Sequence, residues 1–441
     1  MMLPTVSQRA EKVVGGAEQS SIRTGATVVD GAAVVAGELI LGGTVPEGVG
    51  PPQAIKTASN AAQAALRVTR GRVSALLSSG MRVAFRNGEG ERELGVAGGV
   101  WQDGGDDPLV DVTRFWALPG LADCHAHLAA DSLTDVNQSG EMEAIRLRAF
   151  AQLERGVFLV IDKGWRDEVF LRLLEEPPDT RPHLEGAARI ITGVHGYFPG
   201  FAVEVDDTDL PKAVAAANTS GGWVKLVGDW PQKGRGPVVN FGEEALTRAC
   251  EVAHAAGARV AIHAMAPVTP GLAVRAGVDS IEHGLYLTQD ELGELGQRGG
   301  AWVPTIANTE NVMTGFSSGS TAARVLGEGL DNLRSLLPLA TEAGVTVLAG
   351  TDLGLRHGEV AVEVQRLHEY GLAGPDAVEA AGSAAYRYCR LQPFTTGSSA
   401  DLLLFNTDPA TNPSSLAIPV AGVRAGRVVF DRQRLFPNSD F

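Results

Sequence analysis

Short apolar runs alternate with helix-like stretches from residue 121 to residue 349, and this alternation restricts the fold more than any other feature of the sequence. The helix-like stretches include residues 141–155, 243–256 and 290–297. Such alternation is typical of parallel strands joined by crossover helices. The apolar runs predict eight strands, at residues 121–124, 157–161, 188–192, 223–227, 259–262, 279–282, 301–305 and 346–349.

Eight parallel strands with intervening helices predict a (β/α)8 TIM barrel, which takes roughly 250 residues and leaves room for an accessory domain. Before the barrel, short runs at residues 72–77, 81–85 and 94–96 are separated by Gly, Asn and Asp turns and predict a small sheet. Residues 1–70 contain one strand-like run at 26–35. This segment could be part of the β-domain, an extension or sequence upstream of the natural start.

The charge and the cysteine content exclude several classes of protein. A formal net charge of −15 argues against nucleic acid or an anionic membrane as the main partner. The N-terminus lacks an apolar signal region, and no uncharged window reaches the roughly 20 apolar residues of a membrane span. Three widely spaced cysteines suggest neither a disulfide framework nor a thiolate zinc site. We therefore expect a cytoplasmic protein that acts on a small-molecule substrate. The sequence is compatible with a homo-oligomer and does not decide the oligomeric state.

Polar residues stand at or near the ends of five predicted strands, where barrel enzymes carry their catalytic groups. Each could be a structural residue on its own, but their joint order along the strands indicates metal ligands. His125 and His127 are two positions apart, so on a strand they share a face and can converge on one ion. Asp123 could orient a ligand or form a turn. The complete set of candidate ligands is His125, His127, Lys225, His263, His283 and Asp352.

With these residues in these places, the chain resembles the amidohydrolase superfamily, with residues 115–390 as the barrel. The segments 397–405 and 420–430 resemble the C-terminal strands that return, in this superfamily, to complete an N-terminal β-sandwich. The resemblance therefore implies a barrel over residues 118–394 and a small β-sandwich built from residues 71–117 and 395–441. Within the superfamily, the ligand set is similar to the binuclear subgroup with a carboxylated lysine, nearest to prolidase-like and imidazolonepropionase-related members.

The resemblance implies two divalent metal ions, zinc first, bridged by a carbamate that carbon dioxide forms on Lys225. Burial lowers the pKa of a lysine, and the neutral amine can capture carbon dioxide. His125, His127 and Asp352 would hold one ion, and His263 and His283 the other. A hydroxide bridging the ions would attack the substrate carbonyl, and Asp352 would move its proton to the leaving nitrogen.

Other residues just past the strand ends are candidates for substrate contact. His195 lies in the run Thr-Gly-Val-His-Gly, which is loosely similar to the Thr-Gly-Gly-His-Gly of prolidase-like members, where the histidine contacts the substrate. We count it as a catalytic candidate with Asp352 and Lys225. A cation here could hold a substrate carboxylate and an aromatic ring an apolar group. Further candidates are Tyr197, Lys163, Trp230 and Arg356, whereas His183, His254 and His368 are interpreted as structural.

Several functions remain open within this family. Deaminases and imidazolonepropionases usually place an acid three residues after the strand-five histidine, where this chain has Ala266. Dihydroorotases resemble His-x-His-x-Arg, and the arginine position here is Ala129. We therefore predict a metal-dependent hydrolase of a linear amide or peptide-like C–N bond. The alternatives are a hydrolase of lactones or cyclic amides and, with less support, a structural homologue without activity.

Overall fold

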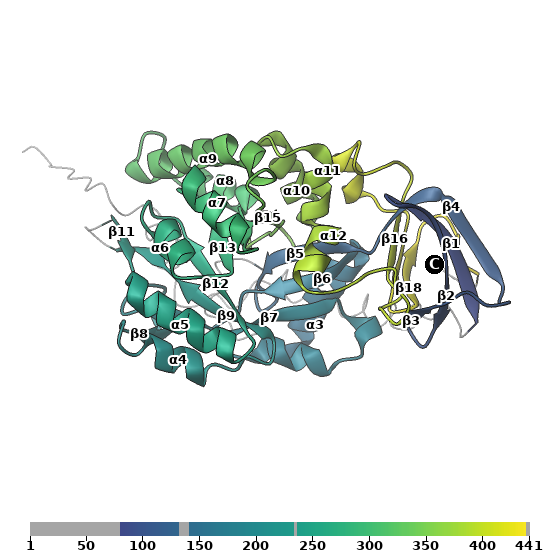
Figure 1. Ribbon diagram of the computed structural model, residues 1–441, viewed down its shortest axis with the longest axis horizontal. Helices are drawn as coiled ribbons and strands as arrows, with labels where there is room; N and C mark the ends of the chain where they lie inside the picture. The colour runs from purple at the N-terminus through teal and green to yellow at the C-terminus, as the bar shows by residue number, and fades with distance from the viewer. Residues whose placement is uncertain (1–79, 132–140, 233–235, 438–441) are drawn as a thin grey trace, which may run out of the picture.

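The computed structural model describes residues 80–131, 141–232 and 236–437, and its larger part is a barrel of eight parallel strands (Figure 1). All eight predicted barrel strands are present, so the predicted fold class is confirmed. The predicted strands at 26–35 and 72–77, like all of residues 1–70, lie outside the described residues. The barrel strands, in order around the sheet, are β5 (Leu121–Ala126), β6 (Val157–Asp162), β7 (His183–Gly193), β9 (Gly222–Val227), β12 (Arg259–Ala264), β13 (Ser280–His283), β14 (Ala301–Val303) and β15 (Thr346–Val347).

Near-continuous apolar sequence explains why these segments form barrel strands. Every residue of β6, Val-Phe-Leu-Val-Ile-Asp, is buried, as expected for a parallel strand covered on both faces. The sheet closes where the segment after β15 meets β5. There the amide of Cys124 donates to the carbonyl of Ala349 at 2.8 Å, and the amide of Asp352 donates to the carbonyl of His125, also at 2.8 Å.

Helices surround the barrel, and the three predicted ones are confirmed within a residue or two of their expected ends. Helix α7 begins with a capping box formed by Thr288 and Glu291. The periodicity did not predict the long α9. The helices are α3 (Met142–Glu154), α4 (Leu210–Ala216), α5 (Glu243–Ala255), α6 (Thr269–Arg275), α7 (Gln289–Gln297), α8 (Ile306–Thr314), α9 (Thr321–Ala340), α10 (Val360–Glu369), α11 (Gly374–Ala380) and α12 (Ser383–Tyr388).

Several short elements that the sequence did not predict lie in the connections between the barrel strands or after the barrel. Strand β8 (Val203–Val205) pairs with β7, and β10 (Asp229–Gln232) forms a two-stranded antiparallel sheet with β11 (Gly236–Val239). The 3-10 helices η2 (Val169–Glu175) and η3 (Pro178–Thr180) stand where the connection from β6 to β7 would carry an α-helix, and η4 (Pro413–Ala417) follows the barrel.

A second sheet, built from both parts of the chain that flank the barrel, lies beside it (Figure 1). Strand β16 pairs with β4, so the later segment completes the sheet begun by the earlier one, as the resemblance implied. Phe85, Trp101 and Phe394 pack in its core, with the rings of Phe85 and Phe394 4.8 Å apart. The strands, in sheet order, are β18 (Arg427–Asp431), β17 (Ala421–Arg424), β16 (Leu402–Phe405), β4 (Leu109–Leu118), β1 (Met81–Asn87), β2 (Gly90–Ala97) and β3 (Val100–Gln102).

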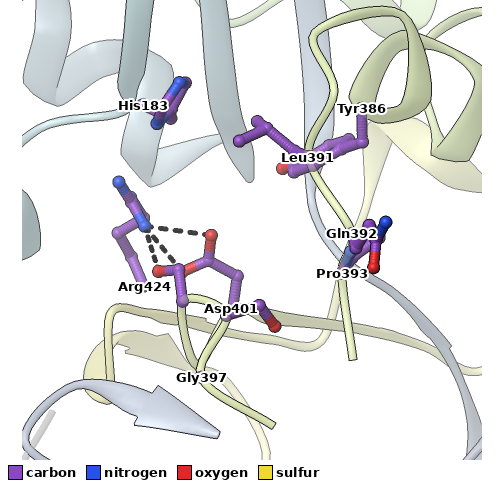
Figure 2. A pocket seen from close by; sticks show the side chains of 10 residues that line it. His183, Tyr386, Leu391, Gln392, Pro393, Gly397, Asp401 and Arg424 are labelled. Atoms are coloured by element: carbon purple, nitrogen blue, oxygen red, sulfur yellow. Dashed lines mark hydrogen bonds and ion pairs between the residues drawn. The ribbon is translucent and has the colours of Figure 1, made fainter. Parts of the chain in front are cut away.

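A buried ion pair lies where this sheet meets the barrel, beside a cavity of about 290 Å³ (Figure 2). Nη1 of Arg424 lies 2.8 and 2.9 Å from the two carboxylate oxygens of Asp401. The same arginine donates from Nε to the carbonyl of Arg181, just before β7, so it links the sheet to the barrel. His183, interpreted as structural, lines this cavity.

None of the helices in the described ranges is long and apolar enough to cross a lipid bilayer.

We expect Arg424→Met to lower the free energy of unfolding by about 3–5 kcal/mol, because the Asp401 carboxylate would stay buried without its cation. Urea denaturation followed by circular dichroism measures the change. The matched control is Arg324→Met, which breaks an exposed pair with Glu328 on α9 and should cost no more than about 1 kcal/mol. Equal losses in the two variants would contradict the prediction.

Candidate metal centre

Three of the predicted ligands converge on the Asp352 carboxylate at the C-terminal end of the barrel. Nε2 of His125 and Nε2 of His127 each lie 3.3 Å from Oδ1 of Asp352. Nε2 of His283 lies 3.7 Å from Oδ2 of the same carboxylate. The group of His125, His127 and Asp352 is compact enough to hold a metal ion.

The other two predicted ligands, His263 and Lys225, border the same group. The ring of His263 lies 4.6 Å from that of His283, centroid to centroid. Lys225 is buried in β9, and its Nζ has no hydrogen-bond partner within the described part of the chain. Burial lowers the pKa of Lys225 to about 8, with the Lys163 ammonium acting in the same direction. The structure therefore brings all six predicted ligands to one end of the barrel.

Two of the three histidines around Asp352 make a hydrogen bond through the other ring nitrogen, Nδ1: His127 with the carbonyl of Gly164 at 2.8 Å and His283 with Oγ1 of Thr305 at 2.6 Å. Nδ1 of His125 lies 2.7 Å from Oε2 of Glu282, an ion-pair distance. Since a carbonyl can only accept, Nδ1 of His127 carries the proton. The Thr305 hydroxyl donates to the Pro304 carbonyl and so accepts from His283. These contacts leave the Nε2 lone pairs of His127 and His283 facing Asp352, as metal ligation requires.

The imidazole of His263 lies beside Asp229. Its Nε2 lies 3.8 Å from Oδ1 of Asp229, beyond direct hydrogen-bond distance. Oδ2 of Asp229 accepts from the amides of Met265 and Ala266 and so fixes the loop after His263. Burial raises the pKa of Asp229 to about 6.

The charges of His263, His283 and Asp352 are compatible with metal binding. Burial lowers the pKa of His283 to about 3 and that of His263 well below its usual value, so both imidazoles are neutral at pH 7. Burial alone would raise the pKa of Asp352, but the neighbouring His125 outweighs it and holds that pKa well below the usual range. A neutral imidazole and an ionised carboxylate are the forms that bind metals.

Glu282 carries a second buried charge beneath the ligands. Its Oε1 lies 3.0 Å from Nζ of Lys163 and accepts from the Ser280 hydroxyl, while Oε2 faces His125. Burial would raise the pKa of Glu282, but Lys163 and His125 together lower it. Glu282 was not predicted from the sequence, although a charged residue in a buried strand, between Ile281 and the candidate ligand His283, is a signal that could have identified it.

The backbone is strained at three positions of the site. His283, Thr305 and Asp352 have φ angles of 64°, 48° and 43°, in the left-handed region that residues other than glycine seldom adopt. Such strain costs of order 1–3 kcal/mol per residue and persists where surrounding contacts impose it. The left-handed conformation at these three residues therefore lowers local stability, and the contacts that surround the site maintain it.

Buried contacts from neighbouring elements impose the position of Asp352. Asp123, which the sequence left open between an orienting role and a turn, accepts from the Thr351 hydroxyl at 2.7 Å and from the Thr351 amide at 3.1 Å. Asn308 on α8 donates to Oδ2 of Asp352 at 2.8 Å. Asp123 therefore orients the loop that carries a ligand.

Glu363 in turn holds the beginning of α8. This carboxylate on α10 is completely buried and accepts from the amides of Ile306 and Ala307 at 2.8 and 2.9 Å. Helix α8 follows Thr305 directly and carries Asn308, so Glu363 supports two residues that contact metal-ligand candidates.

The candidate substrate-binding residues differ in how far they are exposed to solvent. Their predicted roles stay predictions. The side chain of His195 is 86% exposed and lies 3.8 Å from Glu204. The Lys163 ammonium is buried against Glu282, and Arg356 is exposed. The rings of Tyr197 and Trp230 lie 4.6 Å apart. The helical histidines His254 and His368 contact Asp279 and the Leu372 carbonyl, away from the ligands.

Comparison with known proteins agrees with this geometry. The model of the amidohydrolase family matches residues 116–429. An uncharacterized protein of Mycobacterium tuberculosis is 35% identical over 325 residues, which cover 71% of this chain and 85% of that protein. A protein of Mycobacterium bovis matches to the same extent.

Among solved structures, a Xaa-Pro dipeptidase with bound methionine superposes with a TM-score of 0.66 at 21% identity, over 79% of this chain and 99% of that one. A. niger ochratoxinase superposes with a TM-score of 0.64 at 17% identity, over 82% and 99%. At these identities the likeness establishes the fold. By the family match, the chain belongs to the amidohydrolase family. It is accordingly a metal-dependent hydrolase that acts on C–N bonds.

We expect Glu282→Gln to weaken metal binding by about 10- to 100-fold, because the neutral amide no longer places a negative charge 2.7 Å from Nδ1 of His125. Titration of metal-stripped protein with zinc measures the affinity. The control is Glu328→Gln on the exposed side of α9, which should bind zinc as the wild type does. Unchanged affinity in Glu282→Gln would show that this carboxylate has no part in orienting the ligand.

Glu363 predicts a pH dependence of stability. Burial raises its pKa to about 7 from an ordinary value of 4.5, although two backbone amides act against the rise. Between these values the folded protein binds more protons than the unfolded chain, so this group makes the protein less stable as the pH rises. Relative to Glu363→Gln, the wild type should lose up to about 3 kcal/mol between pH 4.5 and 7.

Urea denaturation of both proteins at several pH values tests this difference. Glu328→Gln, which changes an exposed carboxylate, should follow the wild type at every pH. Parallel curves for the wild type and Glu363→Gln would contradict the prediction.

Proposed function

We propose that the protein hydrolyses a linear amide or peptide-like bond of a small substrate with two divalent metal ions, the first held by His125, His127 and Asp352. His263 and His283 would hold the second ion, and a carbamate on Lys225 would bridge the two. The observation that carries the proposal is the Nζ of Lys225, a buried amine with no hydrogen-bond partner among the described residues, which interacts electrostatically with the imidazoles of His125, His263 and His283 and with the Asp352 carboxylate.

The residues fit this metal centre in three respects. An ammonium group buried without a partner is costly, whereas a neutral amine can react with carbon dioxide, lose a proton and become an anionic oxygen ligand. The imidazoles of His127 and His283 already present Nε2 lone pairs. The nitrogen and oxygen donors suit zinc, manganese or iron, and we propose zinc.

When bound, two such ions would polarise the substrate carbonyl and lower the pKa of a shared water. Asp352 then accepts the proton that the attacking water loses and delivers it to the leaving nitrogen. Asn308, which donates to Oδ2, holds the carboxylate in place for both transfers. Thr305 and Glu282 keep His283 and His125 oriented throughout.

The same constellation could open a lactone or a cyclic amide, because attack on the carbonyl needs the same groups. We place these activities second, and a structural homologue without activity third, since the set of candidate ligands is complete. The three cysteines are free and buried, which supports the prediction of a reducing compartment such as the cytoplasm.

We expect Lys225→Ala to lose both bound metal and activity, while Lys212→Ala, which removes an exposed lysine on α4, keeps both. Metal analysis should find about two ions per chain in the wild type. Carbon-13 NMR after loading with labelled bicarbonate should give a carbamate signal that Lys225→Ala lacks. Activity is assayed on N-acyl amino acids, Xaa-Pro dipeptides and lactones. Turnover of lactones alone, or a protein without metal, would overturn the proposal.

A further inference from the structure

Asp162 is a buried carboxylate that has no part in the proposed reaction. It is the last residue of β6, so it lies at the C-terminal end of the barrel, the end that carries the metal-ligand candidates. The five residues before it in the strand are all apolar. A carboxylate that is only 1% exposed in such a strand needs hydrogen-bond partners, because burial removes its hydration.

Both carboxylate oxygens of Asp162 accept hydrogen bonds from backbone amides. Oδ2 accepts from the amide of Leu128 at 2.7 Å, and Oδ1 accepts from the amide of Gly164 at 2.8 Å. Leu128 directly follows the ligand candidate His127, and the carbonyl of Gly164 accepts from Nδ1 of His127 at 2.8 Å. One carboxylate therefore holds two segments of the chain that meet at the same histidine.

These contacts fix the side chain of His127 at both of its ends. The Leu128 amide belongs to the peptide bond after His127, so Asp162 fixes the main chain from which the imidazole extends. The Gly164 carbonyl fixes the rotation of the ring, with Nε2 3.3 Å from Oδ1 of Asp352. Metal sites need their ligands within about 0.5 Å of the productive geometry, so loss of either contact would displace a metal-binding nitrogen.

Gly164 is also held from the side of β7. Its φ angle is 84°, which glycine adopts readily, and a Cβ there would lie 3.2 Å from two carbonyl oxygens of β7. The amide of the next residue, Trp165, donates to the Ala188 carbonyl at 3.2 Å. Asp162 and β7 together therefore set the direction of the carbonyl that orients His127.

Arg148 on α3 holds the segment after His127 in a different way. Its Nη1 donates to the carbonyls of Leu128 and Ala129 at 3.2 and 2.9 Å. These bonds do not depend on the Asp162 carboxylate. A side chain of the same shape in place of Asp162 should therefore leave the chain folded and disturb mainly the orientation of the imidazole.

We propose that Asp162 is a positioning residue of the metal centre and holds His127 in place for the first of the two ions. The proposal rests on the binuclear centre of the proposed function and adds a residue outside the set of ligands. A neutral side chain of the same shape should weaken binding of the first ion by about 10- to 100-fold. The second ion, held by His263 and His283, should stay bound.

The test is titration of the metal-stripped full chain with zinc, which gives the number of bound ions and the affinity of each. Asp162→Asn turns an NH2 group toward one of the two backbone amides, and two donors cannot form a hydrogen bond. Gly164→Ala disturbs the same contacts and leaves the carboxylate unchanged. We expect both variants to bind one ion as the wild type does and the other 10- to 100-fold more weakly.

Asp279→Asn is the matched control. Asp279 also accepts a backbone amide, that of Val260 at 2.8 Å, but it precedes β13 and so lies at the opposite end of the barrel. This variant should bind both ions as the wild type does. Circular dichroism of the metal-free proteins shows whether they are folded, and if one of the two test variants is unfolded, the other decides.

The outcomes separate the two proposals. If the wild type binds fewer than two ions, the proposed binuclear centre fails, and the assignment of Asp162 with it. If the wild type binds two ions, the metal centre stands. Asp162 then loses its assigned role if a folded test variant binds both ions as tightly as the wild type, or if both ions are weakened equally.

Discussion

The metal centre depends on closure of the barrel between its first and last strands. Asp352 donates its amide to the carbonyl of His125, and the Thr351 hydroxyl bonds Asp123 although these two residues are 228 positions apart in the sequence. These contacts place a carboxylate from one end of the barrel domain beside histidines from the other. The closed sheet is therefore what turns scattered polar residues into a site, and the ligands cannot assemble while the ring is open.

Around this junction, buried charge is arranged in layers. Asp352 lies among the imidazoles, and behind His125 the Glu282 carboxylate is paired with Lys163. Removing charges from water is expensive unless each finds a partner, and among the described residues Nζ of Lys225 has no hydrogen-bond partner. A buried amine in this position is what we expect if that amine is chemically modified in the working enzyme.

The sequence predicted the barrel, its eight strands and the convergence of six polar residues, because strand ends of a parallel barrel meet at one rim wherever the chain alternates strand and helix. It did not predict what orients them. The partner of His127 is a backbone carbonyl, which any residue type can provide, so the sequence gives no sign of it. Thr305 has a left-handed backbone angle, which cannot be predicted from the apolar run that precedes it. The β10–β11 hairpin was missed because Asp229–Gln232 is too short and too polar to read as a strand.

The second sheet has a consequence for synthesis of the chain. Its strands β1 to β4 are made first, but β4 pairs with β16, whose residues follow about 280 positions later. At roughly 5–20 residues per second, ribosomes would need on the order of 15 to 60 s to supply the missing strand. During that time one edge of the first four strands has no partner, and the whole barrel is translated before that edge is covered. The edge of β4 is thus exposed to wrong pairing during translation, because its partner is made only after the barrel.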